Sequence, residues 1–101
     1  MPKSNSHSRA QAKAAGKGGK TEASIKNGQK VDAMTANKKR ATEVERSGNF
    51  AKAAQRLKDS GCPQKVMQVP QKDFDKAVEA MKKAGVKGTV KNMGGTKRKS
   101  V

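Results

Sequence analysis

Basic side chains recur along the N-terminal third of this sequence with a spacing that suits contact with a polyanion. They follow one another at intervals of three to six residues, mostly separated by small or polar residues. An extended chain with this spacing can place successive cationic groups along a phosphate backbone, and release of condensed counterions then drives binding. The first candidate nucleic-acid-binding residues are Arg9, Lys13, Lys17, Lys20, Lys26 and Lys30.

Two further basic clusters are candidates for the same contact. The first consists of Lys38, Lys39 and Arg40. It falls in a segment predicted to be helical, so it could dock that helix on a phosphate backbone or simply form a solvated helix surface. The second consists of Lys97, Arg98 and Lys99. It is a phosphate contact or, as the alternative, a short nuclear-localisation patch.

The residue types favour backbone contact over reading of bases. The chain has far more Lys than Arg, and Lys acts on phosphate as a point charge, whereas bidentate recognition of guanine favours Arg. Its aromatic residues are two Phe, with no Trp or Tyr, which leaves almost no platform for stacking single-stranded bases. Phe50 and Phe74 each begin an apolar helix face, so we expect both in the core. Binding should therefore be poorly sequence-specific.

The sequence offers no constellation for catalysis or metal binding. The lone His7 and the single Cys62 are far apart and have no neighbouring ligand-type residues. The acidic residues are scattered over predicted helix surfaces. An enzyme needs a pocket with convergent groups, and the part of the chain that can fold is small. We therefore expect no catalytic residues, no metal site and no cofactor.

Composition and charge predict a small body with two arms. The 101 residues carry a net charge of +16, and only 32% are hydrophobic, against roughly 45–50% in an ordinary domain. Residues 1–40 carry +8, residues 41–61 are nearly balanced at +1, residues 62–93 carry +4 and residues 94–101 carry +3. The prediction is a basic extended N-terminal arm at 1–30, a body at 31–93 and a basic C-terminal arm at 94–101, the arms being disordered or ordered by their ligand.

Two helices are predicted in the first half of the body. Val31, Met34, Ala41 and Val44 fall on one side of a helix over residues 31–46, although Asn37 and Lys38 interrupt the stripe. A second helix should begin after an Asn49 cap, carry Phe50, Ala53, Ala54 and Leu57 on one side, and end at Gly61.

The second half reads as strand, helix, strand. Residues 65–69 form a strand candidate that ends at Pro70. The stripe Phe74, Ala77, Val78, Met81 and Ala84 predicts the clearest helix of the chain, with Asp73 at its start and Gly85 as its stop. Residues 86–91 are a weaker strand, with Val86, Gly88 and Val90 on one face. The predicted fold class is a small α/β (α+β) body, helix-helix then strand-helix-strand.

These features predict a non-enzymatic, structural nucleic-acid-binding protein. We favour a component of a ribonucleoprotein particle such as the ribosome, with RNA slightly preferred over DNA. The first alternative is a protein that condenses DNA in chromatin, a nucleoid or a virion. The second is an assembly protein. Its strand segment 66–69 or 86–90 would add to a partner sheet, or a Met-bearing helix face would dock into a protein groove, while the basic arms would bind an acidic protein partner.

Two further expectations concern where the chain resides. No stretch approaches the apolar length that spans a membrane, and the N-terminus has no apolar signal core. We therefore expect an intracellular or intravirion protein that has no membrane partner and is not secreted by a classical signal.

Overall fold

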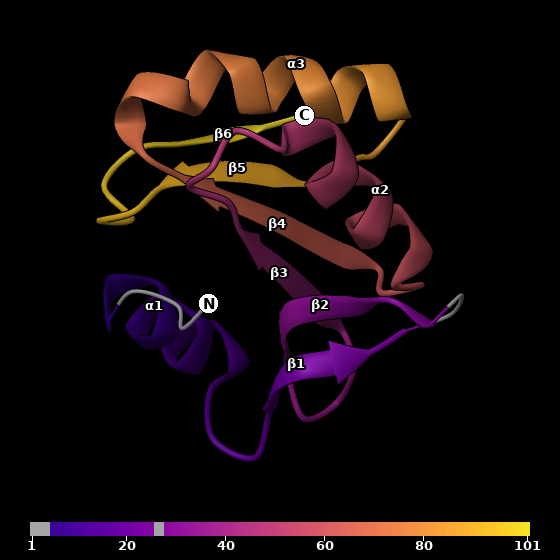
Figure 1. Cartoon of the computed structure of the whole chain (residues 1–101). Coiled ribbons are helices and arrows are strands. Elements are labelled where there is room, and N and C mark those ends of the chain that lie inside the picture. The colour runs from indigo at the N-terminus through magenta and orange to yellow at the C-terminus, as the bar shows by residue number, and fades with distance from the viewer. Residues whose placement is uncertain (1–4, 26–27) are drawn as a thin grey trace.

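The computed structural model describes residues 5–25 and 28–101. Within them, three α-helices and a six-stranded mixed sheet form one small α+β fold (Figure 1). The elements, in chain order, are α1 (Asn5–Ala15), β1 (Lys20–Ser24), β2 (Lys30–Met34), β3 (Arg40–Val44), α2 (Phe50–Asp59), β4 (Gln64–Val69), the 3-10 helix η2 (Gln71–Asp73), α3 (Phe74–Ala84), β5 (Thr89–Asn92) and β6 (Arg98–Ser100).

Strand order in the sheet follows strand order in the chain, from β1 to β6. The first three strands pair antiparallel, and so do β5 and β6. The two central pairings, β3 with β4 and β4 with β5, are parallel. Because parallel neighbours need a crossover connection, α2 and α3 each link one of these pairs.

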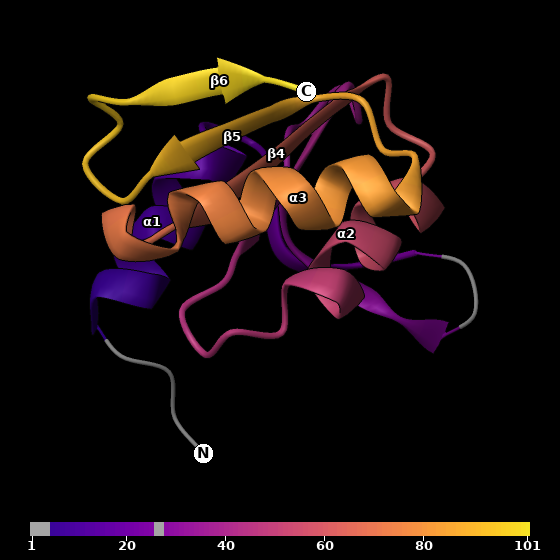
Figure 2. The same cartoon turned by 90° about the horizontal axis from the view of Figure 1, so that it is seen from above.

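The main core lies between the sheet and the two crossover helices. Strand positions such as Ala41, Met67 and Val90 point to α2 and α3, whose buried faces carry Leu57 and Met81. Figure 2 shows α2 and α3 side by side over this face of the sheet. The alternate strand positions lie on the other face, where α1 packs over the strands of the N-terminal half.

The strand-helix-strand prediction is confirmed. Helix α3 begins at Phe74 as predicted, and Gly85 adopts the left-handed conformation, with φ 72°, that ends it. Strands β4 and β5 are parallel neighbours on either side of this helix in the chain, although β5 begins only at Thr89. Phe50 and Phe74 are both buried, as expected of core anchors.

The predicted helix at 31–46 is wrong. These residues form β2, a turn at 35–39 and β3. Asn37, which interrupts the helical stripe, is the centre of that turn, since its side-chain oxygen accepts from Lys39 N at 3.1 Å. Lys38 adopts the left-handed conformation with φ 59°. The apolar spacing that fits one long helix thus fits two short strands equally well.

The extended arms are not confirmed in the described residues. Within 1–30, residues 5–15 form α1, residues 20–24 form β1, and Lys30 begins β2. Within 94–101, residues 98–100 form β6. Composition indicates too little apolar surface to fold here, but the small side chains Ala15, at the end of α1, and Ala23, in β1, are both buried. Lys26 lies outside the described residues.

The second helix begins and ends where predicted, but its start is held differently. Asn49 makes no side-chain cap hydrogen bond to α2. The preceding loop is held instead by Glu45, whose Oε2 accepts from Ser47 N at 2.8 Å and from Asn49 N at 3.4 Å. At the other end Gly61 has φ 71°, as the predicted stop requires.

The backbones of β4 and the segment before β5 approach so closely at Gly88 that a side chain does not fit there. A Cβ on Gly88 would lie 2.1 Å from Lys65 O, in the backbone of β4. Any larger residue would therefore push β5 away from β4 at the point where their parallel pairing begins.

We predict that Gly88→Ala destabilises the fold by about 1–3 kcal/mol, the usual cost of forced overpacking. Denaturant unfolding followed by circular dichroism measures the difference. The matched control is Gly94→Ala, because a Cβ there meets nothing within 4 Å. Equal unfolding midpoints for the two variants would contradict the proposed backbone clash.

Candidate nucleic-acid interface

A groove runs over the sheet face opposite α2 and α3. Helix α1 covers only part of that face, so the rest stays open beside it (Figure 1). The groove has a volume of about 940 Å³ and is walled by α1, the strands β3 to β6 and the β5–β6 turn. Its floor contains strand positions that pair across the sheet, such as Val66 with Thr89 and Gln68 with Lys91.

The groove is lined by basic side chains. Among the described residues that line it, seven are basic and none is acidic. The basic residues are Arg9 and Lys13 from α1, Arg40 from β3, Lys65 from β4, Lys87 from the loop before β5, Lys91 from β5 and Arg98 from β6. Lys65 Nζ donates to the backbone oxygen of Cys62 at 2.5 Å. The other six cations come from separate parts of the chain and create a positive potential in a concave site.

Lys91 shows how closely these charges approach one another. It pairs across the strands with Arg98, and like charges in that position repel. The pKa of Lys91 is lowered, first because the side chain is partly buried and then because Arg98, Arg40 and Lys13 disfavour its charge. An anion in the groove would relieve this repulsion.

The polar framework of the β5–β6 turn positions the groove cations. Asn92 is buried; its Nδ2 donates to Thr96 Oγ1 at 3.0 Å, and its Oδ1 accepts from Lys97 N at 3.2 Å. Gln68 Nε2 donates to Met93 O at 2.9 Å. These bonds hold the turn that leads into Arg98. On the other side of the groove, Arg40 Nε donates to Gln64 Oε1 at 3.0 Å.

Helix α1 is fixed to the sheet by Gln11. This buried side chain donates to Glu22 Oε1 at 3.1 Å and to Asp32 Oδ1 at 3.2 Å. His7 Nε2 lies 3.5 Å from the same Asp32 oxygen. Because Arg9 and Lys13 stand on α1, these contacts also set where two of the groove cations lie.

Asp32 belongs to a buried charge network that reaches α2. Its backbone N donates to Glu43 Oε2 at 2.7 Å, and its own Oδ2 accepts from Val44 N at 2.7 Å. Glu43 is only 1% exposed and pairs with Arg56 of α2. Burial and the nearby Asp32 carboxylate raise the pKa of Glu43 from 4.5 to about 7, against the opposing effect of Arg56.

This raised pKa predicts that the fold is more stable in mild acid than in mild base. The folded protein holds the Glu43 proton more tightly than the unfolded chain does. The resulting stability is complete below the unfolded pKa of 4.5 and is lost as the pH rises through about 7. The shift corresponds to about 3 kcal/mol at most. Urea unfolding across this pH range measures the effect.

The variant Glu43→Gln should flatten that pH dependence, since the amide does not ionise. It should also lower the stability at every pH, because Glu43 accepts from Asp32 N and Arg56 Nε with its two oxygens, whereas Gln has one acceptor oxygen. The matched control is Glu79→Gln, which changes an exposed carboxylate on α3 and should leave the pH dependence as it is. An unchanged pH profile in Glu43→Gln would show that another group is responsible.

The groove contains a minority of the residues expected from the sequence. Arg9, Lys13, Arg40 and Arg98 line it. The others described do not: Lys17, Lys20, Lys30, Lys38, Lys39, Lys97 and Lys99. Lys38 and Lys39 lie in the β2–β3 turn rather than on a helix. Lys97 instead lies over the ring of Phe74, with Nζ 4.6 Å from its centroid.

Sequence reasoning missed three groove cations, Lys65, Lys87 and Lys91. A signal for two of them is present. The predicted strand at 86–91 places Val86, Gly88 and Val90 on one face, so Lys87 and Lys91 fall on the other. The alternation of side chains along this predicted strand therefore indicates a basic face. Counting charges along the sequence does not reveal it, because the highest densities of basic residues lie near the termini.

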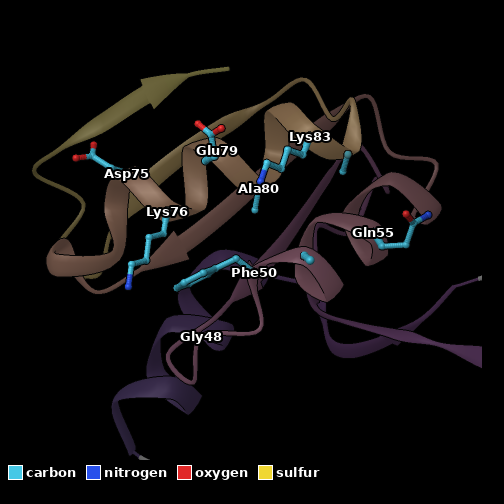
Figure 3. Close-up of a pocket in the computed structure, with 10 residues that line it drawn as sticks. Gly48, Phe50, Gln55, Asp75, Lys76, Glu79, Ala80 and Lys83 are labelled. Atoms are coloured by element: carbon cyan, nitrogen blue, oxygen red, sulfur yellow. The ribbon is translucent and has the colours of Figure 1, made fainter.

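A second hollow lies between α2 and α3, away from the groove (Figure 3). It has a volume of about 730 Å³, with Phe50 among its lining. Its charged residues are mixed, since Asp75 and Glu79 alternate with Lys76 and Lys83 along α3. This mixture gives the hollow no preference for anions.

The described part of the chain offers few groups for metal binding or thiol chemistry. No group of three or more His, Cys, Asp or Glu residues gathers there as a set of metal ligands. The free thiol of Cys62 is buried. None of the helices formed by the described residues has the length and apolar character needed to cross a bilayer.

Comparison with known proteins gives no match, whether to a family model, to a curated protein or to a solved structure.

Proposed function

We propose that this chain is a non-enzymatic nucleic-acid-binding protein that takes a phosphate backbone into the groove between α1 and the open sheet face. The observation that carries the proposal is the lining of the groove, which includes seven basic residues, six of them apart from Lys65, whose ammonium binds Cys62 O, and no acidic residue among those described. Phosphate contacts of this kind give affinity with little sequence preference.

RNA suits the groove better than DNA. Uncharged polar side chains, among them Gln64 and Thr89, lie between the cations. A ribose 2′-hydroxyl both donates and accepts, so such side chains can bind it where deoxyribose offers nothing. A structural role in a ribonucleoprotein particle is the wider function that we favour, and preference for DNA in the experiment below would support DNA condensation instead.

The strand edges and the Met residues that the assembly alternative invokes are paired or buried. Strand β4 is paired on both sides, and β5 is paired with β4 and β6, so neither offers a free edge to a partner sheet. Met34, Met67 and Met81 are all buried in the core. No Met-bearing helix face is therefore exposed by these residues.

The proposal predicts binding to nucleic acid with a steep salt dependence. Matched structured RNA, single-stranded RNA and double-stranded DNA would be titrated with the whole chain over a salt series. We expect a log–log slope on the order of −5 or steeper for the preferred ligand, because several phosphates are neutralised together. A flat slope, or no binding near physiological salt, would refute the proposal.

Variants in which basic side chains are replaced by uncharged Gln then locate the binding surface. The triple variant Lys13→Gln, Lys91→Gln, Arg98→Gln removes three groove cations and should make the slope less steep by about 2–3. The matched control Lys52→Gln, Lys58→Gln, Lys82→Gln removes three exposed charges that do not line the groove. Equal losses from both triples would mean that binding follows net charge and not the groove.

A further inference from the structure

Four of the groove cations come from four different elements and line the same part of the molecule, where the charges of three of them act on the fourth, Lys91. Lys91 of β5 is the centre, with Arg98 of β6 directly across the strand pair. Arg40 of β3 and Lys13 of α1 line the same groove and are near enough to disfavour the charge on Lys91. We call Lys13, Arg40, Lys91 and Arg98 the four-cation subsite.

The charge of this subsite exceeds what one internal phosphate can neutralise. A phosphodiester carries a single negative charge, whereas a terminal phosphomonoester carries about −1.5 to −2 at neutral pH and offers three strong acceptor oxygens. Charge-assisted hydrogen bonds to such a group are correspondingly stronger. Convergence of four cations therefore suits a phosphate at a strand end better than one within a strand.

We propose that the four-cation subsite binds the terminal phosphomonoester of a nucleic-acid strand, whose following phosphodiesters run along the rest of the groove. This inference rests on the proposed function. Two further groove cations, Arg9 and Lys87, are then available for the internal phosphates.

Hydrogen bonds fix the elements that carry three of the subsite cations. The hydrogen bonds of Asn92 fix the turn before Arg98, and Gln64 holds Arg40. Lys13 stands on α1, which Gln11 ties to the sheet. These bonds fix the backbone from which the subsite cations project, and the side chains of Lys13, Arg40 and Arg98 are exposed and open to an incoming anion.

The test compares strand ends at a constant number of phosphates. One short RNA sequence is prepared with a 5′-phosphate or with a 3′-phosphate. The reference has hydroxyls at both ends and is one nucleotide longer, so all three ligands carry equal numbers of phosphates. With the whole chain at near-physiological salt, we expect a phosphorylated RNA to bind about fivefold or more tightly than the reference. The two phosphorylated forms identify which end is bound.

The pH dependence of the preference separates a dianion from a general gain in charge. The second pKa of a phosphomonoester is about 6. The ratio of affinities should therefore be large above pH 7 and fall towards one in mild acid, where both kinds of phosphate are monoanions. Because the reference RNA is measured at each pH, changes in the protein itself cancel from the ratio.

Two double variants place the effect in the subsite. In Lys91→Gln, Arg98→Gln the preference for a phosphorylated end should vanish. In Lys87→Gln, Arg9→Gln, which removes one Lys and one Arg elsewhere in the groove, both affinities should fall while their ratio persists. Equal binding of all three RNAs by the unaltered chain, with its salt dependence intact, would overturn the subsite and leave the proposed function standing. Loss of all salt-dependent binding would overturn both.

Discussion

Two acidic side chains in the N-terminal half, Asp32 and Glu43, connect the sheet to the helix layers on both of its faces. Regular pairing of β2 with β3 covers two residue pairs, Ala33 with Thr42 and Met34 with Ala41. Beyond them, Asp32 accepts from the backbone of β3, and Glu43 accepts from the backbone of β2. The same two carboxylates bind Gln11 of α1 and Arg56 of α2. Removing either would leave buried partners unsatisfied in two layers at once.

This arrangement also explains the polarity of the surface. The chain has a net charge of +16, and two of its few acidic side chains, Glu43 and Glu45, are buried. Acid groups used for internal bonds are not available to neutralise the groove on the open sheet face. The cations there therefore face one another, and the repulsion felt by Lys91 is the local result.

The sequence predicts the C-terminal half well because its signals are unambiguous. The α3 stripe runs over three turns and ends at Gly85, and no strand pattern competes with it. The prediction for residues 31–46 is wrong because apolar spacing alone cannot distinguish a helix from two strands around a turn. Asn37, which lies in that turn, is the residue that distinguishes the two structures. Composition misleads for residues 5–25, since Ala side chains bury little surface each but fit closely on a sheet.

The groove could be predicted only in part. Charge counting finds Arg9, Lys13, Arg40 and Arg98 because they belong to basic segments. It does not show which cations share a face, because that depends on strand register and on where α1 lies. Lys91 becomes central only when β6 pairs beside it, and β6 is too short and too polar to be recognised from its sequence.

The agreement between strand order and chain order has a consequence for how the molecule forms. Each strand pairs with the strand that follows it, so no pairing waits for a segment from the far end of the chain. Loop closure therefore involves only neighbouring elements, which keeps the entropy lost at each step small and favours rapid folding. During synthesis the sheet can grow from its first hairpin by adding one strand at a time, and its unpaired edge moves forward with the emerging chain.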